Sequence, residues 1–397
     1  MTGSDEDELT LKVAGGVDQI PAAEWDACAS ATPETINPFV RHAFFSALED
    51  SKSVSNMAGW KAQHLLLYGP DKSLLGVAPI YLKSHSYGEY VFDFSWAEAY
   101  QRAGGRYYPK LQCAVPFTPV TGPRLMVRPT LPEAQRTNLQ RTLLAGMVEL
   151  ARQLKVSSLH VTFPTDAEAA VMDDAGLLAR IGQQYHWRND GYGTFDDFLA
   201  ALSSRKRKNI RKEREVANSA GIEILTLSGK EITSEHWDAF FQFYMSTSDR
   251  KWGQAYLERS FFDLLGERMG ESVVLMMGRQ GTRWVCGAIN FRSHDTLYGR
   301  NWGTIVDVPM LHFEVCYYRA IDYAIANKLA WVEAGAQGQH KIQRGYLPRA
   351  TYSAHWIADP GLRDAIARYL VAERESVTED MENLTELGPF KRAGASP

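Results

Sequence analysis

The chain has 397 residues, which is too long for one ordinary hydrophobic core and suits two domains of roughly 150–200 residues each. Hydrophobic residues make up 45% and charged residues 23% of the sequence, as in globular proteins. The net charge of −4 excludes a global field that would draw the protein onto nucleic acid or an anionic membrane, so any anion site must be local.

The four cysteines are isolated, without a C-x-x-C pair or a histidine at metal-ligand spacing. We expect them to be small buried residues in a reducing compartment. Residues 1–12 are acidic and polar, unlike a signal peptide, and no apolar run is long enough for a membrane helix. These features predict a cytoplasmic protein without a metal site.

The first half of the chain contains a hairpin, a third strand, a helix and a fourth strand. Residues 64–82 form the predicted hairpin and residues 90–96 the third strand. Apolar residues then recur at helical spacing from Leu139 to Leu154, and residues 157–163 form the next strand. Residues 101–135, rich in proline and glycine, stand between the third strand and the helix.

The second half repeats this order. Residues 273–292 form its hairpin, 296–302 its third strand, 311–325 its helix and 329–335 its fourth strand. The repeat predicts an α/β (α+β) protein of two similar domains, 1–190 and 191–397. The first copy has about 39 additional residues, which we place in the insertion 101–135.

The insertion and the segment between the two copies have predicted roles of their own. A long Pro/Gly loop with aromatic residues is typical of a functional lid, so we expect the insertion to cover a cleft beside residues 335–348. Tyr108 and Lys110 in this insertion are candidate substrate contacts. Residues 194–270 read as a helical connector that begins at a Thr194–Asp197 capping pair.

The segment 333–348 holds the strongest chemical signal, because glycines, a histidine, a lysine and an arginine follow a strand directly. His340 is the first candidate for a general base and Glu333 the second. Lys341 is the candidate for stabilising an oxyanion. The remaining candidate substrate contacts of the segment are Gln337, Arg344 and Tyr346. The alternative is a long surface loop with ordinary polar residues.

Three residues on neighbouring segments are further candidates for substrate binding. Arg300 and Trp302 belong to a strand that should lie beside the Lys341 loop, and Arg300 could hold a carboxylate or a phosphate. Trp252 follows a helix and could line an acceptor pocket. A structural ion pair for Arg300 and simple packing for Trp252 are the alternatives.

A basic run occupies residues 205–214, where seven of ten residues are Lys or Arg. Arg207, Lys208 and Arg211 are candidate contacts to the phosphates of a donor or acceptor. The alternative is a solvated helix face, which is what such runs usually form.

Six segments together resemble one bacterial family, the FemAB-like, peptidoglycan-biosynthesis-type N-acyltransferases. They are EAGAQGQHKIQRGYLP, YYPKLQCAVPFTPVTGPRL, RKRKNIRKER, DRKWG, LYGRNWG and LHFEVCYYRAIDYAI. The resemblance extends over roughly residues 37–373. It implies two tandem GNAT-like domains (the acyl-CoA N-acyltransferase fold), as in the related Fem aminoacyltransferases, which move amino acids from aminoacyl-tRNA onto cell-wall precursors.

The resemblance also implies a reaction and a site residue. Fem enzymes have a Phe-Lys-x-x-Phe-Gly stretch near the acceptor site, and residues 340–345, His-Lys-Ile-Gln-Arg-Gly, are similar, which implicates Lys341. We expect transfer of an acyl or aminoacyl group from acyl-CoA or aminoacyl-tRNA to an amine, without a tightly bound cofactor. The acceptor would be a peptidoglycan-related precursor, with peripheral contact to a lipid-linked form.

Two features of the sequence bear on the donor. It has no coiled-coil arm of the kind that some Fem enzymes use to hold tRNA. Residues 101–106 nearly match the CoA-binding pattern Q/R-x-x-G-x-G/A, but no helix is evident after them, which favours a chance match. The alternative functions are an acyl-CoA-dependent N-acetyltransferase acting on a small molecule and a binding protein that retains the fold without turnover.

Overall fold

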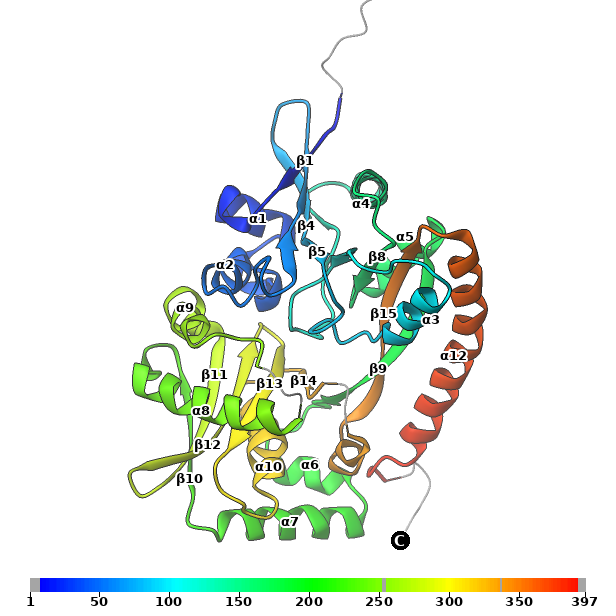
Figure 1. Ribbon diagram of the computed structural model, residues 1–397. Coiled ribbons are helices and arrows are strands. Elements are labelled where there is room, and N and C mark those ends of the chain that lie inside the picture. The colour runs from blue at the N-terminus through cyan, green and yellow to red at the C-terminus, as the bar shows by residue number, and fades with distance from the viewer. Residues whose placement is uncertain (1–7, 252–254, 336–337, 392–397) are drawn as a thin grey trace, which may run out of the picture. The chain divides into compact units, whose positions relative to one another are not determined.

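The chain folds into two compact units in a computed structural model (Figure 1). The structure describes residues 8–251, 255–335 and 338–391. The first unit comprises Met1–Gly182 and Ala350–Val377, and the second comprises Gln183–Arg349 and Thr378–Pro397. None of the helices in the described ranges is long and apolar enough to cross a membrane.

The first unit consists of short strands and helices, followed by residues that return to it from the end of the chain. Its strands are β1 (Thr10–Ala14), β2 (Trp60–Ala62), β3 (His64–Tyr68), β4 (Leu74–Ala78), β5 (Ile80–Lys83), β6 (Lys110–Cys113), β7 (Met126–Val127), β8 (Ser158–Thr162) and part of β15 (Leu347–Ile357). Its helices are α1 (Ala22–Ala29), α2 (His42–Asp50), α3 (Phe94–Arg102), α4 (Glu133–Gln153), α5 (Asp166–Asp174) and the first part of α12 (Pro360–Glu386).

The second unit has longer strands. They are β9 (Leu178–Arg188), which starts in the first unit, β10 (Glu223–Ser228), β11 (Val273–Gln280), β12 (Arg283–Arg292), β13 (Thr296–Thr304) and β14 (Trp331–Glu333). Its helices are α6 (Phe195–Ala201), α7 (Ser204–Asn218), α8 (Ser234–Lys251), α9 (Arg259–Met269), α10 (Leu311–Phe313), the π-helical turn η7 (Glu314–Tyr318), α11 (Arg319–Ala326) and the 3-10 helix η8 (Gln339–Arg344).

The order of the strands is the same in the two units. In the second unit it is β10-β11-β12-β13-β14-β9, antiparallel throughout except for the parallel pair β13–β14. In the first unit β1, β3 and β4 form the antiparallel strands that correspond to β10, β11 and β12. Strand β5 continues β4 after Pro79 and pairs with β6. Strand β6 in turn pairs in parallel with β8, as β13 does with β14. Strand β15 then pairs antiparallel with β8, as β9 does with β14. The predicted internal duplication is confirmed.

Each unit has its own apolar core. In the first unit, Leu139, Leu143 and Met147 on α4 pack against the sheet, as their spacing predicted. In the second unit, Trp187 and Val332 lie on the face of the sheet that is covered by α6, α7, α10 and α11. Helices α8 and α9 cover the other face (Figure 1).

Three expectations about the elements differ from the structure. Residues 90–96 do not form a strand: α3 begins at Phe94, because Trp96, Ala97 and Tyr100 form a helical face that packs on a small core. The third strand is β6, inside the predicted insertion. The insertion is therefore not a surface loop, and its residues Val115 and Leu125 are buried.

The connector and the second domain also differ from the prediction. The connector does not begin with one continuous helix: α6 ends before α7 begins, because Leu202 is extended, buried and bridged to Phe390. The predicted second domain, 191–397, differs at 350–377, which belong to the first unit because β15 pairs there with β8.

Candidate functional site

Strands β13 and β14 form a fork in the second unit. They pair in parallel only from Thr296 to Tyr298, and Tyr298 lies opposite Glu333, the last residue of β14. Beyond this point β13 stays paired with β12 as far as Thr304. The chain after Glu333 instead stays beside β9: the Ala334 amide donates to the Tyr185 carbonyl at 3.1 Å. The two parallel strands therefore separate at Glu333.

A β-bulge lies on β13 where the fork opens. Asn290 of β12 pairs with Gly299, and Ile289 pairs with Asn301, so Arg300 is an extra residue on β13. A bulge re-aims the side chain that it carries and is common beside active sites. Arg300 is half-buried, and its charge acts on Glu333, lowering the carboxyl pKa. Strand β13 is paired with β14 as far as Glu333, the first residue of the segment 333–348.

Three paired residues line one face of the sheet at the vertex of the fork. Tyr298, Glu333 and His186 are direct neighbours on β13, β14 and β9, so their side chains point to the same side. Burial and the charges of Arg349 and Lys341 lower the pKa of His186 to about 4, so this imidazole is neutral at pH 7. Its Nδ1 lies 3.9 Å from Glu333 Oε1.

The positive charge near the Glu333 carboxyl group does not offset the effect of its burial. Its side chain is 14% exposed, and Oε2 is buried without a hydrogen-bond partner among the described residues. Burial raises the pKa of Glu333 to about 8, because the lowering effect of Arg300 is smaller and Asp295 raises it further. At pH 7 this carboxyl is mostly protonated unless a cation joins it.

Lys341 binds the backbone that directly follows β14, on one side of the fork. Its ammonium group donates to the carbonyls of Ala334 and Gly335, at 2.5 and 3.2 Å, and the residue is 4% exposed. Gly345, which follows η8, must be a glycine, because its φ is 90° and a Cβ there would lie 3.0 Å from Phe198. Lys341 thus fixes the strand end that carries Glu333.

His340 lies against aromatic rings at the start of the crossover helix, which consists of α10, η7 and α11. Its Nε2 is 3.1 Å from the Tyr317 hydroxyl, and its ring centroid is 5.3 Å from that of Phe313. The ring of Trp302 joins this aromatic cluster through His312, and the centroids of the Trp302 and His312 rings are 5.5 Å apart. Unlike Glu333 and Lys341, His340 is exposed.

The two other predicted contacts in this segment bind protein groups. Arg344 is buried, donates to both carboxylate oxygens of Glu213 on α7 and lies 3.5 Å from the centroid of the Phe313 ring. Tyr346 is fully buried, and its hydroxyl donates to the Tyr317 carbonyl. These contacts fix η8 to α7 and to the crossover helix. Gln337 and Trp252 lie outside the described residues.

The crossover helix of the second unit begins irregularly. Residues 305–310 contain no glycine, and Met310 has φ of 64°. Three α-helical residues are followed by η7, where buried Glu314 pairs with Arg214 and Arg319. Backbone N–H groups at a regular helix start bind pyrophosphate in many folds, and this helix start is not regular.

The near-match to a CoA loop at residues 101–106 lies at the end of a helix, whereas a CoA loop lies at the start of one. It spans the C-terminal end of α3, where the Gly104 amide donates to the Gln101 carbonyl and the Gly105 amide to that of Tyr100. These N–H groups complete the helix end and do not face an anion. The interpretation of this motif as a chance match is supported.

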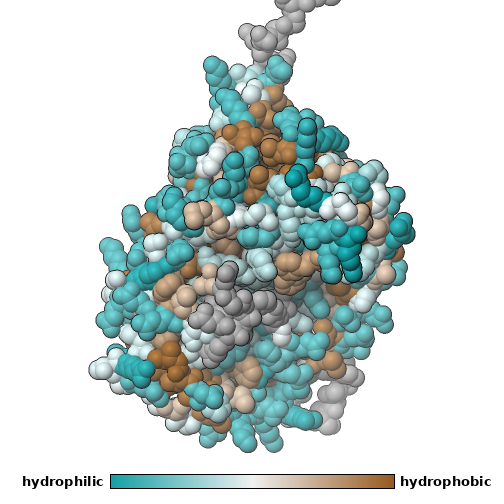
Figure 2. Space-filling model, in the orientation of Figure 1, coloured by the Kyte–Doolittle hydropathy of each residue, from teal (hydrophilic) through white to brown (hydrophobic). Residues whose placement is uncertain are grey.

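Helix α7 presents two different faces. Its inner face carries Ile210, Glu213 and Arg214, which anchor it to the unit. Its outer face carries exposed Lys208 and Arg211, with Arg207 half-exposed beside them. Hydrophilic side chains cover this region in Figure 2. Arg211 pairs with Asp196 at 2.9 Å, but both are exposed, so the pair contributes little.

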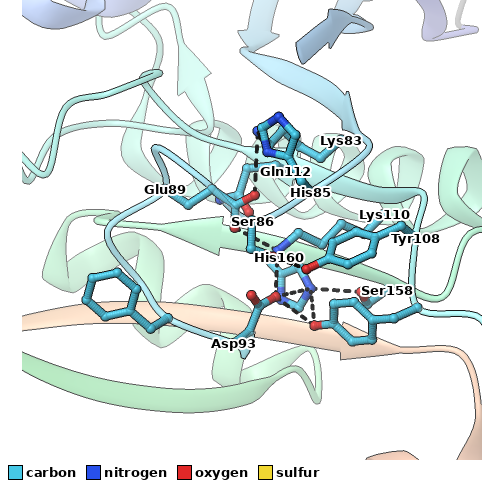
Figure 3. Close-up of polar contacts among 12 residues, drawn as sticks. Lys83, His85, Ser86, Glu89, Asp93, Tyr108, Lys110, Gln112, Ser158 and His160 are labelled. Carbon is cyan, nitrogen blue, oxygen red and sulfur yellow. Dashed lines mark hydrogen bonds and ion pairs between the residues drawn. The ribbon is translucent and has the colours of Figure 1, made fainter. Parts of the chain in front are cut away.

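Tyr108 and Lys110 lie in the first unit, within a buried polar cluster (Figure 3). The Lys110 ammonium donates to Glu89 at 2.7 Å and to Asp93 at 2.5 Å and is fully buried. Asp93 also accepts from the Tyr107 hydroxyl at 2.7 Å. The Tyr108 hydroxyl lies 2.9 Å from Ser86 Oγ. Both predicted substrate contacts are therefore engaged with protein groups.

Further charges and rings extend this cluster. Burial lowers the pKa of Lys83 to about 7 and raises that of Glu89 to about 7. Burial also lowers the pKa of His160, whose Nδ1 lies 2.7 Å from Nδ1 of His355. The described residues bring together no group of three His, Cys, Asp or Glu that could hold a metal ion.

Among the described residues of the first unit there is no equivalent fork. Strands β6 and β8 remain paired to Cys113, the last residue of β6. Beyond them Arg124 is buried, and its Nε donates to the Thr162 carbonyl at the end of β8 at 2.9 Å. Glu168 accepts from the Arg124 and Leu125 amides. A buried arginine thus fills the position where the second unit opens.

Two residues of the site were not predicted from the sequence. Tyr298 belongs to the predicted strand 296–302 without a predicted role, and no role is predicted for His186. The pattern Gln184-Tyr185-His186-Trp187 alternates polar and apolar residues, which would have predicted a strand. Its pairing with a strand about 150 residues later has no local signal.

Comparison with known proteins relates this chain to a family and to solved structures. The FemAB_like family, described as peptidoglycan biosynthesis/recognition, matches residues 16–392. The crystal structure of FemX is 12% identical with a TM-score of 0.53, covering 88% of this chain and 98% of FemX. The C-terminal domain of a putative lysylphosphatidylglycerol synthetase from Agrobacterium fabrum is 8% identical with a TM-score of 0.50, covering 90% and 96%.

A tandem GNAT protein from the clavulanic acid pathway is 12% identical with a TM-score of 0.48, covering 88% of this chain and 99% of that protein. No curated protein sequence matches this chain. The two units have the tandem GNAT-like fold, as their common strand order and the likeness to FemX show. From the family match over nearly its whole length, the chain belongs to the FemAB-like family.

Proposed function

We propose that this protein is an aminoacyltransferase that moves an amino acid from an aminoacyl-tRNA onto a primary amine of a peptidoglycan-related precursor. The fork between β13 and β14 in the second unit carries the proposal, because it is a gap between parallel strands with titratable groups at its vertex. Membership of a peptidoglycan biosynthesis family supports an acyltransferase role and suggests this acceptor class.

The start of the crossover helix favours tRNA over CoA as the donor. A CoA pyrophosphate needs regular N–H groups at a helix start, whereas this helix begins with three α-helical residues that are followed by a π-turn. Basic helix α7 belongs to the same unit and offers contacts for an extended polyanion. An acyl-CoA-dependent N-acetyltransferase remains the second candidate for the GNAT-like fold.

The reaction assigned to this site is aminolysis of an ester. The acceptor nitrogen attacks the ester carbonyl, a C–N bond forms, and the bond from the carbonyl carbon to the tRNA 3′ oxygen breaks. His340 takes the proton from the attacking amine and returns it to the leaving oxygen. Arg300 stabilises the oxyanion of the intermediate, and alignment of the two substrates provides much of the rate.

Lys341 has a different role from the one first predicted. Its ammonium already binds two backbone carbonyls and is buried, so we assign it to positioning the fork and assign the oxyanion to Arg300. Conversion of Lys341 to Met would leave the Ala334 carbonyl without this donor, which should disorder the strand end that holds Glu333.

The basic face of α7 gives a prediction about tRNA binding. Replacing Arg207, Lys208 and Arg211 together by Ala should weaken tRNA binding and flatten its dependence on salt. Each lost phosphate contact lowers the slope of log K against log salt by about 0.7–0.9. The affinity should be measured by filter binding from low to moderate salt.

A matched triple variant in the first unit controls for the change in net charge. Arg141, Arg152 and Lys155 are exposed and lie away from α7 in the sequence. Their replacement by Ala should leave the salt slope unchanged. If the two triple variants had the same slope as the wild-type protein, α7 would be a solvated face only.

A donor screen tests the proposed function itself. The protein should be incubated with charged tRNAs or with acyl-CoAs, together with soluble peptidoglycan precursors that carry primary amines, and new amides detected by mass spectrometry. We expect products from charged tRNA. Products from acyl-CoA alone would establish the second candidate and overturn the choice of donor.

A further inference from the structure

Within the part of the chain that the structure describes, Glu333 lacks one of the hydrogen-bond partners that a buried carboxyl group needs. Oε2 is buried and has no hydrogen-bond partner among the described residues. A buried carboxylate oxygen that accepts no hydrogen bond costs free energy, so such groups in native proteins call for an explanation. Neighbouring His186 is neutral and 3.9 Å away, which is too long for a hydrogen bond.

The neighbouring groups define what kind of ligand would complete the site. Tyr298 supplies an aromatic ring on the same face, and burial together with the Glu333 charge raises the pKa of its hydroxyl. Arg300 reduces the pKa of Glu333 but does not overcome burial. Glu333 Oε2 has no hydrogen-bond donor among the described residues, and a primary ammonium group would supply both that donor and further positive charge.

We propose that Glu333 binds the α-ammonium group of the aminoacyl donor and so selects amino acids over simple acyl groups. The α-carbon of an aminoacyl ester is bonded directly to the reacting carbonyl. A donor whose carbonyl lies between β13 and β14 would place its ammonium group near the vertex where the strands part. This assignment rests on the proposed function, since it requires the donor to enter the fork.

The assignment has a consequence for proton exchange. Because burial raises its pKa to about 8, the Glu333 carboxyl is mostly protonated at pH 7. An ammonium ion beside it favours the carboxylate and lowers its pKa, so binding must release a proton. An acyl group without a positive charge cannot cause this release, and it would leave Oε2 without a donor.

The test compares two stable donor analogues that differ in one group. In 3′-alanylamido-3′-deoxyadenosine the ammonium group is present, and in the lactylamido compound a hydroxyl replaces it; glycyl, seryl and lysyl forms extend the set. Isothermal titration calorimetry at pH 7 in buffers of different ionisation enthalpy measures affinity and proton release together. We expect the amino compound to bind about 10- to 100-fold more tightly and to release protons on binding.

The variant Glu333→Gln keeps the shape of the side chain and removes its charge. It should bind the amino and hydroxyl compounds with similar affinity and release no proton. Glu267→Gln, an exposed glutamate of the same unit, is the matched control and should behave as the wild-type protein does. Circular dichroism confirms that each variant is folded.

Three results would overturn the assignment. The wild-type protein could bind both analogues equally, or it could bind the amino compound without releasing a proton. Glu333-dependent proton release on binding n-butylamine, but not the donor analogues, would show that the ammonium belongs to the acceptor. If transfer from charged tRNA still occurred in these cases, the proposed function would stand. If no transfer from charged tRNA occurred at all, both the proposed function and the role of Glu333 would be contradicted.

Discussion

Replacing Lys110 by Met should destabilise the protein by about 3–5 kcal/mol, because it leaves two buried carboxylates without their shared cation. Lys110 is fully buried and lies 2.7 Å from Glu89 and 2.5 Å from Asp93. Burial would raise the pKa of Asp93, but Lys110 and its neighbours hold it below the ordinary value. Urea unfolding followed by fluorescence measures the loss.

The loss should depend on pH in a defined direction. The depressed pKa of Asp93 stabilises the native wild-type protein above the unfolded-state pKa of about 3.9, and that contribution is lost as pH falls through the lower native pKa. Lys110→Met removes this contribution, so the difference between the two proteins should shrink below about pH 4.

Two further variants isolate the ion pairs. Lys61→Met removes an exposed lysine of the same unit and should cost little. The triple variant Lys110→Met, Glu89→Gln, Asp93→Asn removes all three charges and should recover part of the lost stability. If Lys110→Met were as stable as Lys61→Met, the cluster would not contribute to stability as described.

Replacing His340 by Ala should lower kcat/KM for transfer by about 10²–10⁴, the usual contribution of a general base. Histidine is the side chain whose ordinary titration falls between pH 5 and 8, so the acidic limb of the pH–rate profile should also be lost. Because His340 is exposed, unfolding of the variant should shift little.

The control for this prediction is another exposed histidine of the same unit. His294→Ala should retain the rate and the acidic limb of the profile. Tyr317→Phe keeps the aromatic ring and removes the hydroxyl that lies 3.1 Å from His340, so it should lower the rate less than His340→Ala does. An acidic limb that persists in His340→Ala would refute the assignment of the base.

Much of the fold could be predicted because it depends on local patterns. The helical spacing from Leu139 to Leu154 and the hairpins at 64–82 and 273–292 correspond to elements of the structure. The repeat then linked the two halves. The prediction of a strand at residues 90–96 was wrong. Aromatic residues at every second position are typical of a strand, but the packing of Trp96 and Ala97 favours a helix.

Less of the candidate site could be predicted, since its geometry depends on pairing between distant strands. Glu333 and Arg300 were identified near strand ends, but the bulge that displaces Arg300 arises from pairing with β12. His186 reaches Glu333 through the pair β9–β14. The sequence also cannot show that the cations of Lys341, Arg344 and Lys110 are engaged with protein groups.

A crystal structure with bound 3′-alanylamido-3′-deoxyadenosine tests the central claim most directly. The account predicts that the amide carbonyl lies between β13 and β14, beyond the pair Tyr298–Glu333, with the α-nitrogen in hydrogen-bonding distance of Glu333 Oε2. An analogue bound elsewhere in the protein, with this fork unchanged, would contradict the assignment of the donor site to the second unit.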